Sequence, residues 1–552
     1  MQRTIFNKFF IIAILITASI SAHAQQTPVT PERVGVESAD ALPLSLTEAI
    51  KLALENNNDI RTSRIDVDKA EYKLTATRGA YDPELFSETY FERSSTPVGS
   101  FLGGNNSGSI TQRDFTGRVG LTGLAPKFGG SYTFDLSSTR LSSNNFFNAL
   151  DPTMSARFSI GYTQPLMRGR KTDDTRRQIE IAKKNLTLTD VQFRQRATDV
   201  ITRVEHAYWE LVHALKNLQV QTEAVKQTRA QVETNKRQVA QGVLAPIDVV
   251  EAEAQVKIYE QNVYAAQEEV TKTENALKTL MLADRSAALW SRALLPITPV
   301  NLEAPRMFLA DAINMALENR FELAELRTSK DVNEINRRFY KDQTKPQVDL
   351  QVSYSSNGYA GTLTDNDNPI LDGFTIPGDM QGGYGRAWSN LLGQDNPTVR
   401  VGVRISLPLK NRTAKAELGY SLAEGRRLES VRAQAEQQIE AEVRNAIQRV
   451  RSVEASMSAA AAQRLAAEQQ YTSEQRKFQA GMSTVYLVLQ RQTDLVTARG
   501  RELETQTDLN KAIAEFQRAT GNTFRYRNVA VITDGLRLEQ NEAQLSHTKA
   551  GQ

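Results

Sequence analysis

Two very long stretches of the chain, residues 170–241 and 426–480, contain no glycine and no proline. Both residue types weaken or break helices, so their absence favours uninterrupted helices. At a rise of about 1.5 Å per residue, a helix over 170–241 would be on the order of 100 Å long, which is several times the roughly 30 Å hydrocarbon core of a bilayer. Such a rod must stand in water. We predict long helices over 170–241 and 413–480, each followed by a turn and a second helix, over 247–294 and 484–520.

The first stretch carries an apolar residue at every seventh position, namely Val204, Leu211, Leu218, Val225, Val232 and Val239. This spacing is typical of a helix that packs along other helices as in a coiled coil. The neighbouring seam begins with Ile201, Tyr208 and Leu215 and continues with Thr222, Arg229 and Lys236. The apolar stripe therefore narrows toward residue 241. The polar side is either a solvated coiled-coil face or the lining of a water-filled passage, and the sequence leaves both open.

Residues 1–24 have the pattern of a secretory signal, with Arg3 and Lys8 ahead of the apolar run FFIIAILITASI and the small residues Ala22 and Ala24 around a cleavage point. The apolar run is too short to span a bilayer. The chain has no cysteine, so we expect neither a lipid anchor nor disulfides. We expect a flexible N-terminal segment over 25–43 and a C-terminal tail over 526–552 that is polar and disordered from residue 531.

Shorter segments alternate apolar and polar residues as strands do. In TVRVGVRISL, residues 398–407, the apolar side carries Val399, Val401, Val403, Ile405 and Leu407, and the other side carries Thr398, Arg400, Arg404 and Ser406. Further strands are predicted over 155–164 and 349–355, with weaker candidates over 85–93, 114–124 and 130–138. Such strands fit a membrane-spanning barrel and equally a half-buried sheet in a soluble sandwich. The export signal favours the barrel.

The chain begins the same helix twice. LTEAIKLALEN at 46–56 and LADAINMALEN at 309–319 are identical at seven of eleven positions. Each motif opens a predicted helix, over 46–79 and 309–343, that leads to strands, to loops rich in glycine and asparagine (96–112, 141–153 and 358–397), and to a pair of long helices. Pro165 and Pro408 mark corresponding strand exits. A tandem duplication explains this order; the first repeat covers 44–300, with barrel strands over 85–164, and the second covers 301–525, with barrel strands over 349–407.

A single copy of this chain cannot complete a membrane sheet. An open sheet leaves edge amides and carbonyls without partners in lipid, so strands that span a bilayer must close into a barrel. Barrels begin at about eight strands, and the chain supplies four to six. Several copies must therefore pool their strands, and their helices would form a tube that continues the barrel. A tube of that length, open at a membrane barrel, indicates transport.

These features together resemble the TolC-like outer-membrane efflux protein family, also called outer membrane factors, over residues 44–525. The resemblance rests on LTEAIKLALENN, on the strand exit QPLMRGR, and on the helix turns VAQGVLAPIDVVEAEAQV (239–256) and FQAGMSTVYLVLQRQTDL (478–495). It implies an α+β membrane protein with two tandem repeats per chain. It also implies a homotrimer, in which one outer-membrane β-barrel continues into a long periplasmic coiled-coil tunnel.

The resemblance further implies a function and partners. The chain would be the passive exit duct for small molecules in a tripartite efflux system, located in the outer membrane of a Gram-negative bacterium with a large periplasmic portion. Its partners would be outer membrane lipid, a periplasmic adaptor (membrane fusion) protein and an inner-membrane pump. The outer-membrane component of type I protein secretion is an alternative within transport. An exported coiled-coil scaffold or adhesin is an alternative of another class.

The family places adaptor docking at the two helix turns. By resemblance the docking residues are Gly242, Val243 and Leu244 in the first turn and Gly481, Met482 and Ser483 in the second. The alternative is structural: both glycines would end a helix with a left-handed cap.

The family also narrows its periplasmic mouth near these turns. Asp248 matches an aspartate of that mouth, but Phe478, Leu487 and Gln490 stand where the family has a tyrosine and an acidic pair, and Ser483 stands in place of an arginine. A ring of carboxylates is therefore doubtful here, and Asp248 is expected to cap the helix after Pro246.

The predicted hairpin 114–140 exceeds the four strands per chain that the family usually carries. Either the barrel is larger or the hairpin folds outside the membrane, and we favour the second interpretation.

No pattern in the sequence indicates catalysis, a cofactor or a metal. Cysteine is absent, and His206 and His213 are seven residues apart on one helix, about 10 Å by helical rise, which is too far for shared metal ligation. We expect them, with Tyr208 and Trp209, to serve packing. The formal net charge is only +3, and nothing in the chain indicates a nucleic-acid partner.

Overall fold

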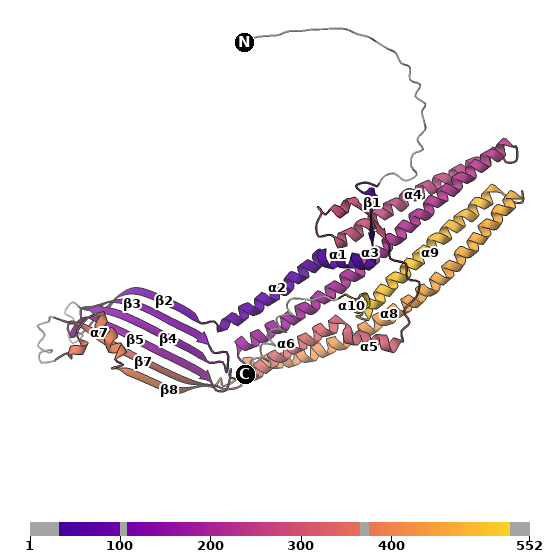
Figure 1. Ribbon diagram of the computed structural model, residues 1–552. Helices are drawn as coiled ribbons and strands as arrows, with labels where there is room; N and C mark the ends of the chain where they lie inside the picture. Colours follow the sequence, from indigo (N-terminus) through magenta and orange to yellow (C-terminus); the bar gives the residue numbers. More distant parts are fainter. Residues whose placement is uncertain (1–32, 100–107, 365–374, 530–552) are drawn as a thin grey trace, which may run out of the picture.

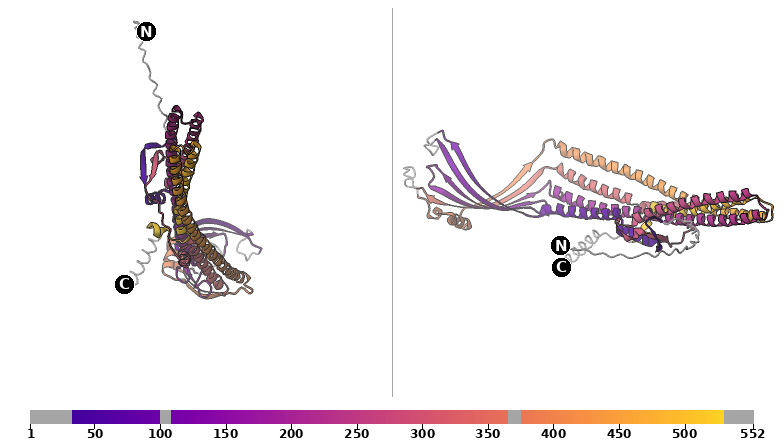
Figure 2. Two further views of the ribbon diagram at one scale, coloured as in Figure 1. Left: turned by 90° about the vertical axis from the view of Figure 1, so that its right-hand side faces the viewer. Right: turned by 90° about the horizontal axis from the view of Figure 1, so that it is seen from above.

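The structure is a computed structural model that describes residues 33–99, 108–364 and 375–529. The molecule is long, with a β-sheet at one end and long helices that run from it to the other end (Figure 1). Two further views show the strands curving away from the helices (Figure 2). The signal predicted over 1–24 and the part of the tail after residue 529 lie outside the described residues. Within the described ranges, no helix is both long enough and apolar enough to cross a membrane.

Both halves of the chain begin with the same pair of helices. The pairs are α1 (Leu46–Asn56) with α2 (Asn58–Arg78), and α5 (Leu309–Asn319) with α6 (Phe321–Gln343). The sequence predicts a single helix over each of 46–79 and 309–343, and both predictions are wrong at the same place. The duplicated motif is one complete short helix, and the chain turns directly after it.

Polar side chains stabilise the backbone at both of these helix breaks. Asn57 has an extended backbone, and its side-chain oxygen accepts a hydrogen bond from the N–H of Asp59 at 2.8 Å. At the second break the buried Arg320 guanidinium forms ion pairs with Glu322 and with Glu442 of a later helix. A side chain that bonds to the first turn of the next helix offers the backbone an alternative to continuing the previous one.

The strands form one antiparallel sheet. Its members, in spatial order, are β2 (Glu84–Pro97), β3 (Ser109–Leu124), β4 (Ser131–Ser143), β5 (Leu150–Pro165), β7 (Gln347–Leu363) and β8 (Pro397–Ser406). A strand is present at each of the six predicted positions. β2 and β8 are the two edges of the sheet, and neither has a second partner strand among the described residues.

One face of the sheet is apolar. The register places Val399 of β8 opposite Tyr354 of β7, and Tyr354 opposite Ile160 of β5. The same row continues across β4, β3 and β2 through Phe134, Leu121 and Leu85. We call this side the apolar face; it carries the odd-numbered residues of β2, β3 and β8 and the even-numbered residues of β4, β5 and β7. The remaining residues of these strands form the polar face.

The hairpin predicted over 114–140 is an integral part of this sheet. Its strands β3 and β4 pair with each other and also with β2 and β5. The hairpin is therefore not separate from the other predicted strands, and the described sheet has six strands rather than four. This arrangement does not support the expectation that the hairpin lies outside the membrane. The segments predicted as loops are also shorter than expected, because β2 and β3 extend into 96–112 and β4 and β5 extend into 141–153.

The predicted loop over 358–397 contains a helix, α7 (Tyr384–Leu392), that the sequence did not reveal. This helix packs on the apolar face over β5 and β7, where Ala387 and Leu391 join Met154, Ala156 and Ala360 in a small core cluster. The approach is close. A Cβ added to Gly358 would lie 1.9 Å from the backbone oxygen of Ala387, so only glycine fits beneath the helix.

Two helices, α3 (Asp174–Ala240) and α8 (Arg412–Gln479), extend from the sheet to the far end of the molecule (Figure 1). Two shorter helices, α4 (Pro246–Met281) and α9 (Val485–Ala519), return from that end and stop short of the sheet. In α3 the predicted seam is fully buried at Val204 and Leu211 and remains buried at Val225 and Val232. α3 contacts both α4 and α9, so the hairpins of the two repeats pack together.

The helix predicted over 247–294 ends early, at Met281. Asp284 then forms a turn by accepting the N–H of Ser286 at 2.8 Å. After a short 3₁₀ turn the chain continues as β6 (Arg292–Pro296), which pairs in parallel with β1 (Glu37–Leu44). The segment 25–43 is thus not wholly flexible, because most of β1 lies in it.

A buried ion cluster fixes this two-stranded unit. Lys278 and Glu274 of α4 pair at 2.6 Å with both side chains fully buried, and Arg33 pairs with the same carboxylate at 2.9 Å. The Lys278 ammonium also donates to the carbonyl oxygens of Trp290 and Arg292 at 2.9 and 2.7 Å. A buried pair needs such additional partners, because desolvation otherwise offsets its attraction.

The predicted tail over 526–552 is structured at its start. α10 (Thr523–Arg527) follows α9, and its Arg527 donates to the fully buried Glu205 of α3, with the Nε to Oε1 distance at 2.6 Å. This contact brings the end of the described chain onto the middle of α3.

Candidate functional site at the helical tips

The two turns singled out by the sequence lie together at the end of the molecule farthest from the sheet. The first joins α3 to α4 and the second joins α8 to α9 (Figure 1). Both turns are short and exposed at their centres. They form the tip of the molecule, which we define as residues 241–250 and 480–490.

Each turn ends its helix with a glycine in the left-handed region. Gly242 has φ 75° and Gly481 has φ 72°. The N–H of Gly242 donates to the Val239 carbonyl, and the next N–H, of Val243, donates to Gln238, both at 2.9 Å. Gly481 and the residue after it repeat the same two bonds. This is the Schellman arrangement, in which glycine avoids the steric cost of positive φ. The capping interpretation of both glycines is therefore confirmed.

The helix that follows each turn is capped differently. In the first turn the N-cap is Ala245, which has no side-chain acceptor, and Asp248 reaches back to accept the Ala245 N–H at 3.1 Å. In the second turn the N-cap is Thr484, whose hydroxyl accepts the N–H of Leu487 at 3.4 Å. The prediction that Asp248 caps the helix after Pro246 is confirmed. Leu487 occupies the matching position, where no acid is needed because Thr484 supplies the cap.

Two of the predicted site residues are largely packing residues. Leu244 and Phe478 lie against a cluster formed by Val232, Ala252, Val256, Val485 and Leu489. These five buried side chains come from α3, α4 and α9, so the cluster joins the two hairpins just behind the tip. Only part of Leu244 and of Phe478 reaches the surface.

The surface of the tip is apolar. Val243 is 68% exposed and Met482 is 73% exposed, each directly after its capping glycine. The sequence reasoning missed three further exposed apolar side chains one turn later, Ile247, Val250 and Tyr486. The sequence contains an indication of them, because they are apolar residues in the first turns of two helices, where an exposed tip without a partner would carry polar residues. Leu487 is partly exposed and Gln490 is exposed beside them.

Ser483 serves the structure of the second turn. Its hydroxyl donates to Glu474 of α8 at 2.5 Å. This hydrogen bond lowers the pKa of Glu474 below its ordinary value, and Lys477 adds to the effect through its ion pair. The carboxylate therefore stays charged and holds the turn against the last helical turn of α8.

The polar seam of α3 forms ion pairs with α4. Arg229 pairs with Glu260 at 2.6 Å, and Lys236 pairs with Glu253 at 3.0 Å. The pKa of Glu260 is lowered because Arg229 and Lys257 donate to it. Both cations are about half exposed, so each pair stabilises the first hairpin while one side of it stays in contact with solvent.

His206, Tyr208 and Trp209 of α3 contact their neighbours within the chain. The His206 ring lies 3.5 Å from the Glu515 carboxylate. Tyr208 is fully buried, donates to the Leu44 carbonyl at 2.9 Å and accepts the Thr298 N–H at 3.0 Å. Trp209 packs edge-on against it. In the described part of the chain, no group of three or more His, Cys, Asp or Glu side chains is placed to hold a metal ion.

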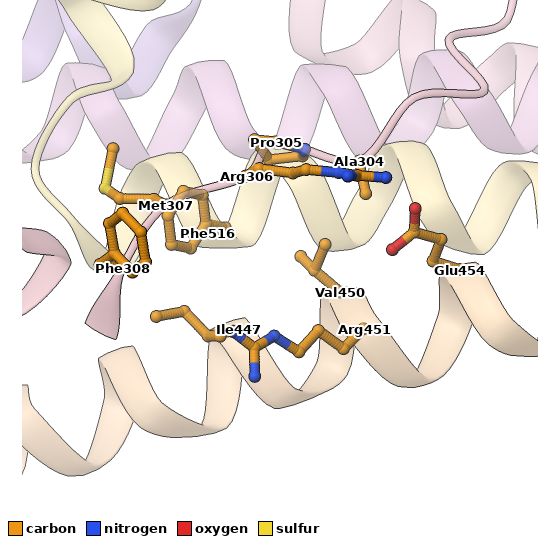
Figure 3. A pocket seen from close by; sticks show the side chains of 10 residues that line it. All are labelled: Ala304, Pro305, Arg306, Met307, Phe308, Ile447, Val450, Arg451, Glu454 and Phe516. Carbon is orange, nitrogen blue, oxygen red and sulfur yellow. The ribbon is translucent and has the colours of Figure 1, made fainter.

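A cavity of about 390 Å³ lies where the chain passes from the first repeat to the second, between residues 304–308 and the helices α8 and α9 (Figure 3). Its walls are mostly apolar, with Met307, Phe308 and Phe516 on one side and Ile447 and Val450 on the other. Its charged side chains are Arg306, Arg451 and Glu454. This set contains no nucleophile with a neighbouring base, so it does not form a catalytic constellation.

Comparisons with known proteins point to one family. A family model described as outer membrane efflux protein matches residues 118–281 and 312–522. The chain is similar in structure to the CmeC outer membrane channel of Campylobacter jejuni, with a TM-score of 0.60 and 14% identity, over 87% of this chain and 86% of that one. No curated protein sequence matches closely enough to count as a relative.

Two further channels show the same likeness. The open-state MtrE outer membrane channel of Neisseria gonorrhoeae is 17% identical with a TM-score of 0.56, over 87% of this chain and 89% of that one. The outer membrane protein VceC of Vibrio cholerae is 15% identical with a TM-score of 0.57, over 87% of this chain and 96% of that one. At these identities the likeness is one of fold.

Proposed function

Because the chain belongs to the outer membrane efflux protein family, and so serves as an outer-membrane exit duct for efflux, we propose that three copies assemble into one continuous passage. In this assembly the sheets of the three copies close a single barrel in the outer membrane. Their long helices form a tunnel below it, in the periplasm. The trimer is a passive conduit, and energy for export comes from the partner at the inner membrane.

The observation that carries this proposal is a sheet with two free edges and an exposed apolar face. Along β8 the apolar side chains Val399, Val401, Val403 and Ile405 are all more than half exposed. An apolar face of this kind suits lipid, but lipid does not tolerate the unpaired edges of β2 and β8. Pairing β8 of one copy with β2 of the next satisfies both edges and buries neither face.

The number of strands supports a wide barrel. Each chain contributes six strands, so three copies supply three times six, or eighteen. Barrels of about 16–18 strands leave an aqueous channel. The polar face would line that channel, with Arg118, Asp135 and Arg157 among its side chains. This is wider than four strands per chain would give.

We further propose that the apolar tip is where a periplasmic adaptor docks. Val243 and Met482 stand at corresponding places of the two repeats, so three chains would present six similar apolar points in a ring. The caps beneath them are self-contained, which leaves these side chains without a structural role inside the chain. An apolar, exposed patch of this kind suits helix ends of a partner.

Cross-linking of the sheet edges tests the assembly. The chain has no cysteine, so introduced thiols give no background. We would combine Ser87→Cys on β2 in turn with Val399→Cys, Val401→Cys or Val403→Cys on β8, all on the apolar face. If β8 of one copy pairs with β2 of the next, oxidation in membranes yields a covalent trimer for at least one combination.

The control places one cysteine away from the edge. Ser138→Cys lies on β4, in the interior of the sheet, and combined with Val401→Cys it should yield no cross-link. A covalent species of another size, or only single chains from every edge combination, would contradict the proposed closure.

A further inference from the structure

The apolar face carries charge at one place only. Among its paired residues in the described strands, the charged side chains are Arg93 of β2, Arg113 of β3 and Arg140 of β4. All three are exposed. They lie toward the ends of their strands that are remote from the long helices, because β2 leaves the helices at Glu84 and reaches its far end at Pro97. We call these three residues the arginine patch.

The register brings these arginines next to one another. Arg93 is directly opposite Arg113, and Arg140 is opposite Phe115, two residues along β3 from Arg113. Side chains directly opposite each other in an antiparallel pair have Cβ atoms about 5 Å apart, and like charges at that spacing are destabilising. The sheet therefore places three like charges together without an evident structural benefit.

No carboxylate of the described chain neutralises the patch. None of the three arginines forms an ion pair there, and the carboxylates Glu92, Asp114 and Asp135 of the same strands belong to the polar face. Asp151 lies near Ser142 at the irregular start of β5, but its oxygens accept hydrogen bonds from Ser142 and Ser143. Among the described residues the patch therefore keeps a positive charge that an anionic ligand can complement.

The surroundings of the patch restrict what that anion can be. On the helix-proximal side of the arginines the same face carries Val119, Leu121, Phe134 and Leu136. On the far flank, α7 covers β5 and β7, and its Trp388, like Leu136 and Phe158, is partly buried against the small core cluster beneath the helix. An anion that fits here has a charged end at the arginines and long apolar chains along the strands below.

From this arrangement we propose that the arginine patch binds the phosphate groups of an anionic lipid in the outer leaflet. This inference rests on the proposed function, which puts the apolar face in lipid and the helices in the periplasm. Guanidinium groups bind phosphate through paired hydrogen bonds in a planar fork, which ammonium groups cannot do. The patch and α7 then mark the level of the lipid headgroups, where aromatic side chains such as Trp388 are also favoured.

The test uses the purified full-length protein in detergent and measures its affinity for lipid A that carries its phosphates. The variant replaces Arg93, Arg113 and Arg140 with glutamine. The matched control replaces Arg157, Arg400 and Arg404 with glutamine; it removes the same charge from the polar face of the same sheet. We expect the patch variant to bind at least about tenfold more weakly, which corresponds to about 1.4 kcal/mol, and the control to bind like the wild type.

Two further probes separate the possible ligands. Lipid A without its phosphates should bind the wild-type protein as weakly as phosphorylated lipid A binds the patch variant. Inorganic phosphate at the concentration of the lipid should not compete. Equal affinity of the wild type and the patch variant, indifference to the lipid phosphates, or full competition by inorganic phosphate would each overturn the proposal.

A single substitution tests the proposal even if the triple variant fails to fold. Arg113→Gln changes only the central residue of the patch and should weaken binding of phosphorylated lipid A by a few-fold; unchanged affinity would also overturn the proposal. The cross-link between β2 and β8 provides the independent readout. If that cross-link fails while selective lipid binding persists, the proposed trimeric barrel is wrong and the arginine patch stands.

Discussion

The two turns cap the helix that follows them with different side chains. Gly242 and Gly481 close their helices in the same way, but the next helix is capped by Asp248 in the first turn and by Thr484 in the second. The aspartate in one turn and the leucine in the other therefore follow from which residue stands at the N-cap. A carboxylate committed to a cap is a poor candidate for a free charged ring, so closure of the mouth by acidic residues is not supported by the geometry of Asp248.

The docking role of the tip can be tested without disturbing the caps. We predict that Val243→Asp combined with Met482→Asp abolishes efflux of a fluorescent dye from cells while leaving the amount and thermal stability of the assembled protein unchanged. Both side chains are more than two-thirds exposed, so the added charges change the stability of the fold little. Burying them against an apolar partner would cost desolvation free energy and so weaken docking. Gln261→Asp adds a charge to an exposed position of α4 outside the tip, without removing an apolar group, and should export normally. Normal export by the double variant would remove the docking proposal.

At the scale of helices, polar contacts between α3 and α4 set the stability of the first hairpin near its tip. The pKa of Glu260 is lowered by the donors Arg229 and Lys257, because the folded state stabilises the charged carboxylate more than the unfolded chain does. Its contribution is present above the ordinary glutamate value of 4.5 and is lost as the pH falls through the lowered pKa.

This linkage predicts a pH-dependent effect of Glu260→Gln. The melting temperature of the variant should lie below that of the wild type at pH 7, and the gap should close as the pH is lowered below about 4.5, the ordinary glutamate value. Glu268→Gln, on the exposed side of the same helix and outside any ion pair of the described chain, should track the wild type throughout. A gap for Glu260→Gln that is constant from pH 7 to pH 3 would show that the ion pair is not its cause.

The elements that the sequence predicted well are those fixed by local pattern. Strict alternation located the strands, and the absence of glycine and proline located α3 and α8. The elements that it missed depend on distant partners. β1 needs β6, some 250 residues later, and α7 is a short helix between glycines that is stabilised by packing on Ala156 and Gly358. The early end of α4 likewise depends on contacts of Lys278 with the chain that follows.

The candidate site was predictable to a similar degree. The capping glycines and Asp248 follow from local rules and were located from the sequence alone. The burial of Leu244 and Phe478 was not, because it depends on Val485 and Leu489 of the other repeat. The arginine patch was also out of reach, since its three residues become neighbours only through the register of β2, β3 and β4.

At the scale of the whole molecule, we propose that the chain is one segment of a wall that three copies form together. Its sheet ends in two free edges, its apolar face is exposed, and its hairpins reach a common tip at the opposite end (Figure 1). Six strands are fewer than the eight or so that the smallest membrane barrels contain. The features that leave the single chain incomplete are the features that three copies would complete together.

Native mass spectrometry of the protein extracted from membranes in detergent tests this most directly. The account predicts one dominant species that contains three chains and that dissociates only when the detergent or the fold is disrupted. A protein released from cells without detergent, with the mass of a single chain, would contradict it.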